Sequence, residues 1–145
     1  MSPTNPPSQA PTAAELLANP VVQAAIDQAW SDSQADDAGA RHEEGGWIYL
    51  DRTTGQLTIR RAPVKGQAGI DLTAPPYVAG AVVVGKFHTH PNPKAEGWKT
   101  GPGASDVFYD TVHGVPDLIK AEDGIHLSGP DRRRGGLVGG PGYPP

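Results

Sequence analysis

The chain has 145 residues, enough for one small domain, and its formal net charge is −4. This mild acidity argues against nucleic acid as a partner, because nucleic-acid-binding domains carry a basic face. The sequence has no cysteine, which excludes disulfides, thiolate zinc ligands and a cysteine nucleophile, so any metal site must use histidine and carboxylate ligands.

The first segment, residues 1–12, is rich in Pro, Ser and Thr and is expected to be a disordered tail. It has neither the basic start nor the apolar stretch of a secretory signal, and no apolar run approaches the length of a membrane span. We therefore expect no membrane partner and a cytoplasmic location by default, with export that needs no signal peptide still open. A second tail, rich in Gly, Pro and Arg, is expected over residues 130–145, which leaves residues 13–129 as the domain.

Two helices are expected at the start of this domain. Residues 13–19 form a short helical candidate. Asn19 followed by Pro20 is typical of a helix start, with Asn as the N-cap and Pro at the first helical position. From Val21 to Trp30 the apolar residues fall near one face, which predicts a second, amphipathic helix.

The rest of the domain is expected to form strands around one central strand. Residues 47–50 and 56–60 predict a first hairpin, and residues 81–90 contain a β-branched apolar run typical of a buried strand. After a polar loop, residues 105–112 predict a short helix, and a second hairpin follows over residues 116–127. This order predicts a small mixed α/β domain in which a curled sheet is flanked by helices.

Two histidines stand at the end of the central strand. His88 and His90 are two residues apart, so on a strand their side chains point to the same face, and Pro91 ends the strand. Two imidazoles on one face can supply half of a tetrahedral zinc site. The alternative is that both are solvated surface histidines.

Carboxylates on either side of this pair could complete a hydrolytic site. Asp106 begins the helix after the polar loop and is the best candidate for a third ligand, although it could simply offset the charge of the helix N-terminus. Zinc-dependent hydrolysis also needs a carboxylate that accepts a proton from the attacking water. Glu43 and Glu44, before the glycines at the head of the first hairpin, are the candidates, and at least one of them is expected to be a solvated loop charge.

Together these residues resemble the motif of the JAMM metallopeptidases, also called the JAB or MPN family, in its small bacterial form. The family pattern is an upstream Glu, then His-x-His-Pro, a spacer, and Ser-x-x-Asp. The resemblance covers most of the predicted domain and implies a JAB/MPN-like sheet of cytidine-deaminase-like architecture. It also implies zinc bound by His88, His90 and Asp106, and Glu43 as general base in the hydrolysis of a peptide or isopeptide bond. Family spacing selects Glu43 over Glu44, because the family Glu stands three residues before a strand Gly.

The chain departs from the family pattern in the loop after the histidines. The spacer before Asp106 is a few residues longer than usual, and Gly103 stands where the family has the Ser that helps to hold the oxyanion. Such a hydrogen-bond donor contributes roughly 3 kcal/mol to catalysis. Ser105, Thr100 or a backbone N–H could replace it. Trp98 in the same loop could line a substrate groove or cover the core.

Three functional hypotheses follow. The first is a zinc metallopeptidase or isopeptidase with a protein or peptide substrate; ubiquitin-like conjugates, peptidoglycan peptides and a propeptide are all compatible. The second, motivated by Gly103, is a weakly active or inactive binding module that keeps the fold, with or without the metal. The third concerns context: a bacterial effector, toxin or phage-tail-associated hydrolase cut from a larger protein. His42, His113 and His126 fit no ligand pattern and are expected at the surface or in turns.

Overall fold

The computed structural model describes residues 10–64, 69–98, 100–102, 114–129 and 134–139, with the last of these described through the backbone alone. In chain order its elements are α1 (Ala13–Ala18), α2 (Pro20–Asp32), β1 (Gly45–Asp51), β2 (Leu57–Arg61), β3 (Ala81–His90), the 3₁₀ helix η1 (Lys94–Glu96), β4 (Asp117–Ala121), β5 (Gly124–Ser128) and β6 (Arg134–Gly139).

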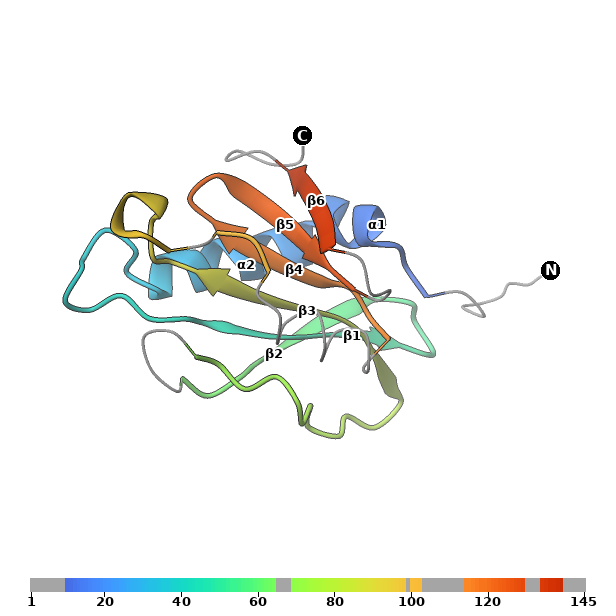
Figure 1. Ribbon diagram of the computed structural model, residues 1–145. Coiled ribbons are helices and arrows are strands. Elements are labelled where there is room, and N and C mark those ends of the chain that lie inside the picture. Colours follow the sequence, from blue (N-terminus) through green and yellow to red (C-terminus); the bar gives the residue numbers. More distant parts are fainter. Residues whose placement is uncertain (1–9, 65–68, 99, 103–113, 130–133, 140–145) are drawn as a thin grey trace.

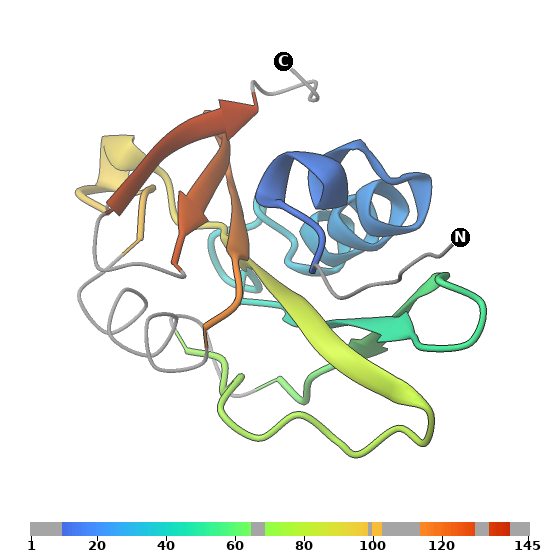
Figure 2. The ribbon, with the colours of Figure 1, turned by 90° about the vertical axis from the view of Figure 1, so that its right-hand side faces the viewer.

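The described strands form one six-stranded sheet in the order β2-β1-β3-β4-β5-β6. Neighbouring strands are antiparallel except β3 and β4, which are parallel. The sheet curls around α1 and α2, which cover one of its faces, while the long connection from β2 to β3 runs along the other (Figures 1 and 2). This is the mixed α/β class that the sequence predicts, with β3 near the middle of the sheet.

Both helices begin at the capping residues that their sequences favour. The Thr12 hydroxyl accepts a hydrogen bond from the Glu15 amide, and the Glu15 carboxylate accepts one from the Thr12 amide, which makes a capping box. At α2, the Asn19 side chain accepts a hydrogen bond from the Val21 amide, and Pro20 occupies the first turn. The predicted start of α2 is therefore confirmed.

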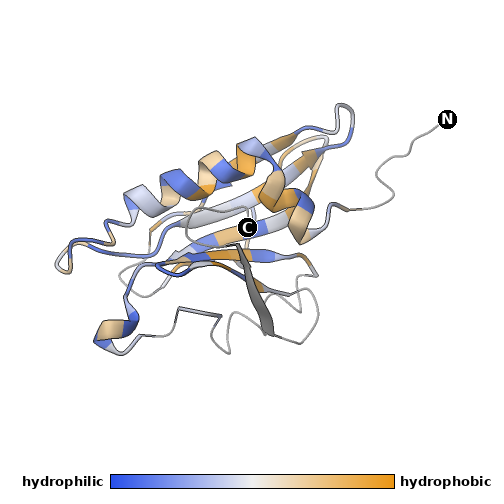
Figure 3. Cartoon of the chain, turned by 90° about the horizontal axis from the view of Figure 1, so that it is seen from above, coloured by the Kyte–Doolittle hydropathy of each residue, from blue (hydrophilic) through white to orange (hydrophobic). Residues whose placement is uncertain are grey.

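The buried face of α2 differs from the predicted one, because Val21 and Ala24 are both exposed. Val22, Ile26 and Ala29 are buried, whereas Val21 is 45 % exposed. Buried positions spaced by four and then three residues form the single stripe that a helix presents to a sheet. Figure 3 shows polar and apolar residues alternating along this helix above the sheet.

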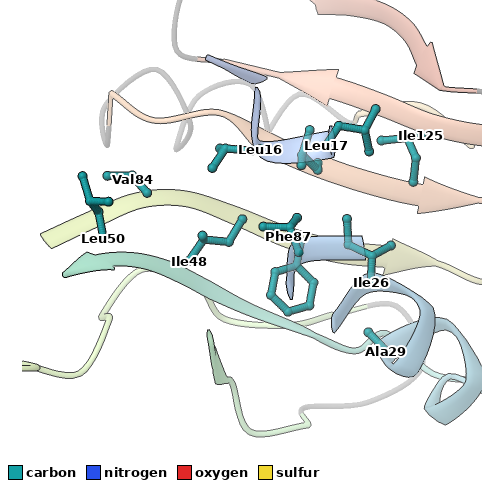
Figure 4. Close-up of a cluster of buried hydrophobic side chains, with 11 residues drawn as sticks. Leu16, Leu17, Ile26, Ala29, Ile48, Leu50, Val84, Phe87 and Ile125 are labelled. Carbon is teal, nitrogen blue, oxygen red and sulfur yellow. The ribbon is translucent and has the colours of Figure 1, made fainter. Parts of the chain in front are cut away.

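The main core lies between the helices and the sheet. Its buried side chains come from α1, α2, β1, β3, β4 and β5 (Figure 4): Leu16, Leu17, Val22, Ile26, Ala29, Ile48, Leu50, Val84, Phe87, Leu118 and Ile125. A smaller cluster lies on the opposite face, where Trp47 and Tyr49 pack with Ala62 and Leu72. Covering both faces buries nearly all of β1 and the last part of β3, so the histidine end of β3 is held rigidly.

The sheet extends beyond the domain boundary expected at residue 129. Residues 134–139 form β6 and pair with β5, so this part of the expected C-terminal tail is an edge strand. Three of the six residues of this segment are Gly, a residue that is depleted in strands, which is why local composition suggested a tail. Its pairing depends on the neighbouring strand and not on its own strand propensity.

Candidate metal centre

The site begins where β1 lies against the end of β3. Gly45 is paired with His88, and a Cβ added at Gly45 would lie 2.3 Å from the Phe87 carbonyl oxygen and 2.7 Å from the His88 Cβ. At Gly46 an added Cβ would lie 2.1 Å from the Arg60 carbonyl oxygen. No side chain fits at such distances, so the two glycines are what allow three strands to approach one another here. This approach brings residue 43 next to the histidines.

Alternation along β3 separates the histidines from Thr89. The Thr89 side chain is fully buried, and its hydroxyl lies 2.6 Å from the Ser33 hydroxyl at the end of α2. His88 and His90 point to the opposite face, where their ring centroids are 4.9 Å apart and their Nε2 atoms 3.2 Å apart. The His88 side chain is buried, so the expectation of two solvated surface histidines does not describe this pair.

The other nitrogen of each ring faces a hydrogen-bond acceptor. His88 Nδ1 lies 3.1 Å from Asp117 Oδ1, and His90 Nδ1 lies 3.2 Å from the Thr100 carbonyl oxygen. A carbonyl oxygen can only accept, so His90 donates through Nδ1; the carboxylate favours the same tautomer for His88. In neutral imidazoles this leaves a lone pair on each Nε2. Two Nε2 lone pairs that converge in this way can both bind one cation. Histidines that bind a metal typically donate their other ring N–H to a carboxylate or a carbonyl, as His88 and His90 do here.

The spacing of these atoms fits a tetrahedral ion. Bonds of about 2.05 Å at tetrahedral angles place two ligand nitrogens about 3.3 Å apart, and the Nε2 atoms of His88 and His90 are separated by 3.2 Å. Glu43 adds a carboxylate oxygen, and the ligand atoms of all three residues lie within 4.8 Å of one another. The described residues therefore include a His–His–Glu group that could hold a metal ion.

Glu43 and Glu44 lie in different surroundings. Glu43 is half-buried beside the histidines. Glu44 is buried, with one carboxylate oxygen 2.6 Å from Arg61 Nη2 and the other 2.6 Å from His42 Nε2. Its backbone is hydrogen-bonded to Thr89 in both directions. Glu44 is thus not a solvated loop charge, and its anchoring directs Glu43 to the histidine side.

His42 is part of this ionic cluster. A hydrogen bond to the Ala40 carbonyl raises the pKa of His42 above its usual value, burial opposes this change, and the Glu44 carboxylate adds to it. Arg61 also contacts Asp32 of α2 at 3.1 Å. The cluster therefore joins α2, β2 and the chain before β1. His42 lies in that chain with its side chain 20 % exposed, so it is partly at the surface as expected, and its contacts with Glu44 and Ala40 add to that expectation.

The loop after His90 is held by the turn between β4 and β5. Thr100 is buried, and its hydroxyl donates to Asp123 Oδ2 at 3.0 Å while its carbonyl faces His90. Asp123 also contacts Lys94 Nζ at 3.0 Å and His126 Nε2 at 2.9 Å. Burial alone would raise the pKa of Asp123, but hydrogen bonds from these neighbours lower it to about 2. In this arrangement the Thr100 hydroxyl donates its proton to Asp123, so it is not available to donate to an oxyanion. Thr100 instead accepts a hydrogen bond from His90 through its carbonyl oxygen.

The remaining predicted site residues have different outcomes. Trp98 is 44 % exposed, so it does not cover the core. Asp106, Ser105 and Gly103 lie outside the described residues, and the roles predicted for them remain predictions. His126 is on β5 and is mostly buried against Asp123, not at the surface or in a turn.

Comparisons with protein-family models, with curated proteins and with solved structures found no match to this chain. Among the helices of the described residues, none has the length and apolar character required to cross a bilayer. The site therefore has to be interpreted from its own chemistry.

The residues that hold the histidine rings were not predicted in that role, although Thr100 was a candidate oxyanion donor. Asp117, the Thr100 carbonyl and Asp123 come from β4, a loop and a turn, and none has a local ligand pattern. Asp117 reaches His88 because β4 is parallel to β3, with Asp117 paired with Lys86. An acidic residue at the head of a predicted neighbouring strand was the one available signal.

Proposed function

We propose that this chain is a zinc-dependent hydrolase that cleaves a peptide or isopeptide bond in a protein or peptide substrate. The observation that supports this most directly is the convergence of His88 Nε2, His90 Nε2 and the Glu43 carboxylate within one small volume. The resemblance of the same residues to the JAMM motif points to the same chemistry. The proposed JAB/MPN-like fold rests on that resemblance together with the mixed sheet.

Two arrangements of ligands are open for the proposed zinc ion. In the first, His88, His90 and Asp106 hold zinc and Glu43 is the general base. In the second, Glu43 is itself the third ligand, since two histidines and a glutamate also form a common catalytic zinc set. We favour the first, because zinc hydrolysis needs a carboxylate outside the ligand set and Glu43 is placed beside the histidines.

Zinc bound here would polarise the substrate carbonyl and lower the pKa of a bound water to about 7. Glu43 accepts a proton as the water oxygen bonds to the carbonyl carbon. It returns that proton to the amine nitrogen as the carbon–nitrogen bond breaks. Asp117 and the Thr100 carbonyl hold the two imidazoles in the tautomer that directs Nε2 to the centre.

A pocket on the same face of the sheet offers room for part of a substrate. Lys86 belongs to this pocket and lies two residues before His88 on β3, so both side chains point to this face. The walls are mainly apolar, formed by Trp47, Leu72, Pro75, Val83 and Val115. We infer that a substrate with an apolar side chain near the cleaved bond would be preferred.

The decisive test is metal content followed by turnover. Protein purified without chelator should contain about one zinc per chain by elemental analysis, and His88→Ala or His90→Ala should lose it. Zinc should also raise the thermal midpoint of the wild type, because an ion bound only by the folded state stabilises that state. Absence of stoichiometric metal would refute the proposal. Zinc binding without cleavage of any peptide or isopeptide library would instead support the inactive binding module suggested by Gly103.

A further inference from the structure

The Asp123 carboxylate joins the loop after His90 to the β4–β5 hairpin. Its Oδ2 accepts from the Thr100 hydroxyl and from Lys94 Nζ, each at 3.0 Å, and its Oδ1 contacts His126 Nε2 at 2.9 Å. His126 belongs to β5, whose backbone is fixed by pairing with β4. Asp123 therefore connects a loop residue, Thr100, to a rigid part of the sheet.

This connection ends at a ring nitrogen of the candidate metal centre. The Thr100 carbonyl lies 3.2 Å from His90 Nδ1, so the position of Thr100 determines the direction in which the His90 Nδ1–H donates. The loop also packs on the hairpin, because a Cβ at Gly101 would lie 3.4 Å from His126 Nδ1. Thr100 is only 4 % exposed, so water competes little for its hydrogen bonds.

We propose that Asp123 is a positioning residue: acting through Thr100, it orients His90 and thereby sets the metal affinity of the site. The inference rests on the proposed function, since it concerns the same centre. Asp123 does not contact His90, and its effect passes through one backbone carbonyl. Partners one step removed from a ligand typically alter metal affinity by 10- to 100-fold.

A purely structural role is the competing explanation, in which Asp123 fastens the loop for stability alone. The same loop has a second anchor that makes a matched control. Glu122, beside Asp123 in the turn, accepts a hydrogen bond from the Lys94 amide at 2.6 Å, whereas the Thr100 hydroxyl donates to Asp123. Loss of this anchor loosens the loop without releasing the Thr100 hydroxyl.

The experiment compares Asp123→Asn, Thr100→Val and Glu122→Ala with the wild type; alanine at 122 removes the oxygen that accepts from the Lys94 amide. Zinc affinity is measured by competition with a chromophoric chelator, and thermal midpoints are recorded with and without zinc. We expect Asp123→Asn and Thr100→Val each to weaken zinc binding about 10-fold, with Glu122→Ala close to the wild type. A variant that combines Asp123→Asn with Thr100→Val should bind zinc no more weakly than Asp123→Asn alone, because Asp123 acts on His90 only through Thr100.

A second readout does not depend on metal. In metal-free protein at pH 8, ¹⁵N NMR should show His90 as the Nδ1–H tautomer in the wild type and as a mixture of tautomers in Asp123→Asn and Thr100→Val. Unchanged affinity and tautomer with a lower thermal midpoint would overturn the inference and leave a structural role. If the wild type binds no zinc, the proposed function fails and the tautomer result alone decides the role of Asp123. Thr100→Val keeps the test possible if the Asp123 variant does not fold.

Discussion

Two adjacent glutamates at the head of β1 differ in what holds them. Glu43 stands by the histidines, whereas Glu44 is fixed between Arg61 and His42. If Glu43 is the general base, Glu43→Gln keeps the shape of the side chain and removes proton transfer. We expect turnover to fall by roughly 10²-fold or more with zinc content unchanged. Loss of zinc in this variant, measured by elemental analysis, would make Glu43 a ligand instead.

Glu44→Gln should show the opposite behaviour. The change removes a buried charge whose oxygens contact Arg61 and His42, so we expect a loss of about 1–3 kcal/mol in the free energy of unfolding. Zinc content and turnover per folded molecule should remain near the wild type. Urea unfolding monitored by tryptophan fluorescence provides the measurement, and an unchanged midpoint would show that the cluster contributes no net stability.

Asp117 is the direct partner of His88, and its side chain is almost fully buried. Replacement by Asn keeps the size and leaves an amide oxygen that can still accept, but it removes the negative charge that faces His88 Nδ1. We expect Asp117→Asn to weaken zinc binding by roughly 10-fold. Ser128→Ala, which removes another buried polar group of the same strand pair, serves as a control for general loss of packing. Equal zinc affinities in wild type and Asp117→Asn would exclude this role.

At the scale of elements, the approach of β1 to β3 depends on Gly45. An alanine there must push the β3 backbone away, and overpacking of this kind costs up to about 3 kcal/mol. For a chain of this size that corresponds to a thermal midpoint lower by about 10 °C. Zinc affinity should fall as well, because Glu43 and His88 move apart. Gly39→Ala is the control, since its added Cβ meets nothing closer than 3.6 Å.

Local signals predicted most elements and the histidine pair. Asn19-Pro20 marks a helix start through the N-cap hydrogen bond, and His88-x-His90-Pro91 marks a strand end through side-chain alternation. These signals depend on neighbours in the chain. The same is true of the alternation that separates Glu43 from Glu44, although the burial of Glu44 depends on Arg61, which is 17 residues away.

Non-local pairing explains what could not be predicted. Asp117 meets His88 across 29 residues because two strands pair in parallel, and no local pattern encodes that register. The edge strand β6 exists by pairing with β5, while its Gly-rich composition indicates a tail. The partners of the two histidine rings are thus brought into place by the assembled sheet and cannot be read from the local sequence.

At the scale of the whole molecule, two ionic clusters make stability depend on pH in opposite directions. The pKa of Asp123 is lowered from 3.8 to about 2, so its contribution is present above pH 3.8 and is lost as the pH falls through 2. The shift corresponds to at most about 2 kcal/mol. The pKa of His42 is raised above 6.5, so its contribution is present below pH 6.5 and is lost as the pH rises through the folded-state value.

These two groups predict a plateau of stability between about pH 4 and pH 6.5, with a decline on each side. The measurement is urea unfolding of metal-free protein from pH 2 to pH 9, with chelator present so that zinc binding does not add its own pH dependence. Asp123→Asn should reduce the decline on the acid side, to which the lowered pKa values of Asp32 and Asp51 also contribute, and leave the alkaline side unchanged. His42→Gln should reduce the decline on the alkaline side. A variant that shifts the whole curve without changing its slopes would show that its residue contributes packing and not a change in protonation.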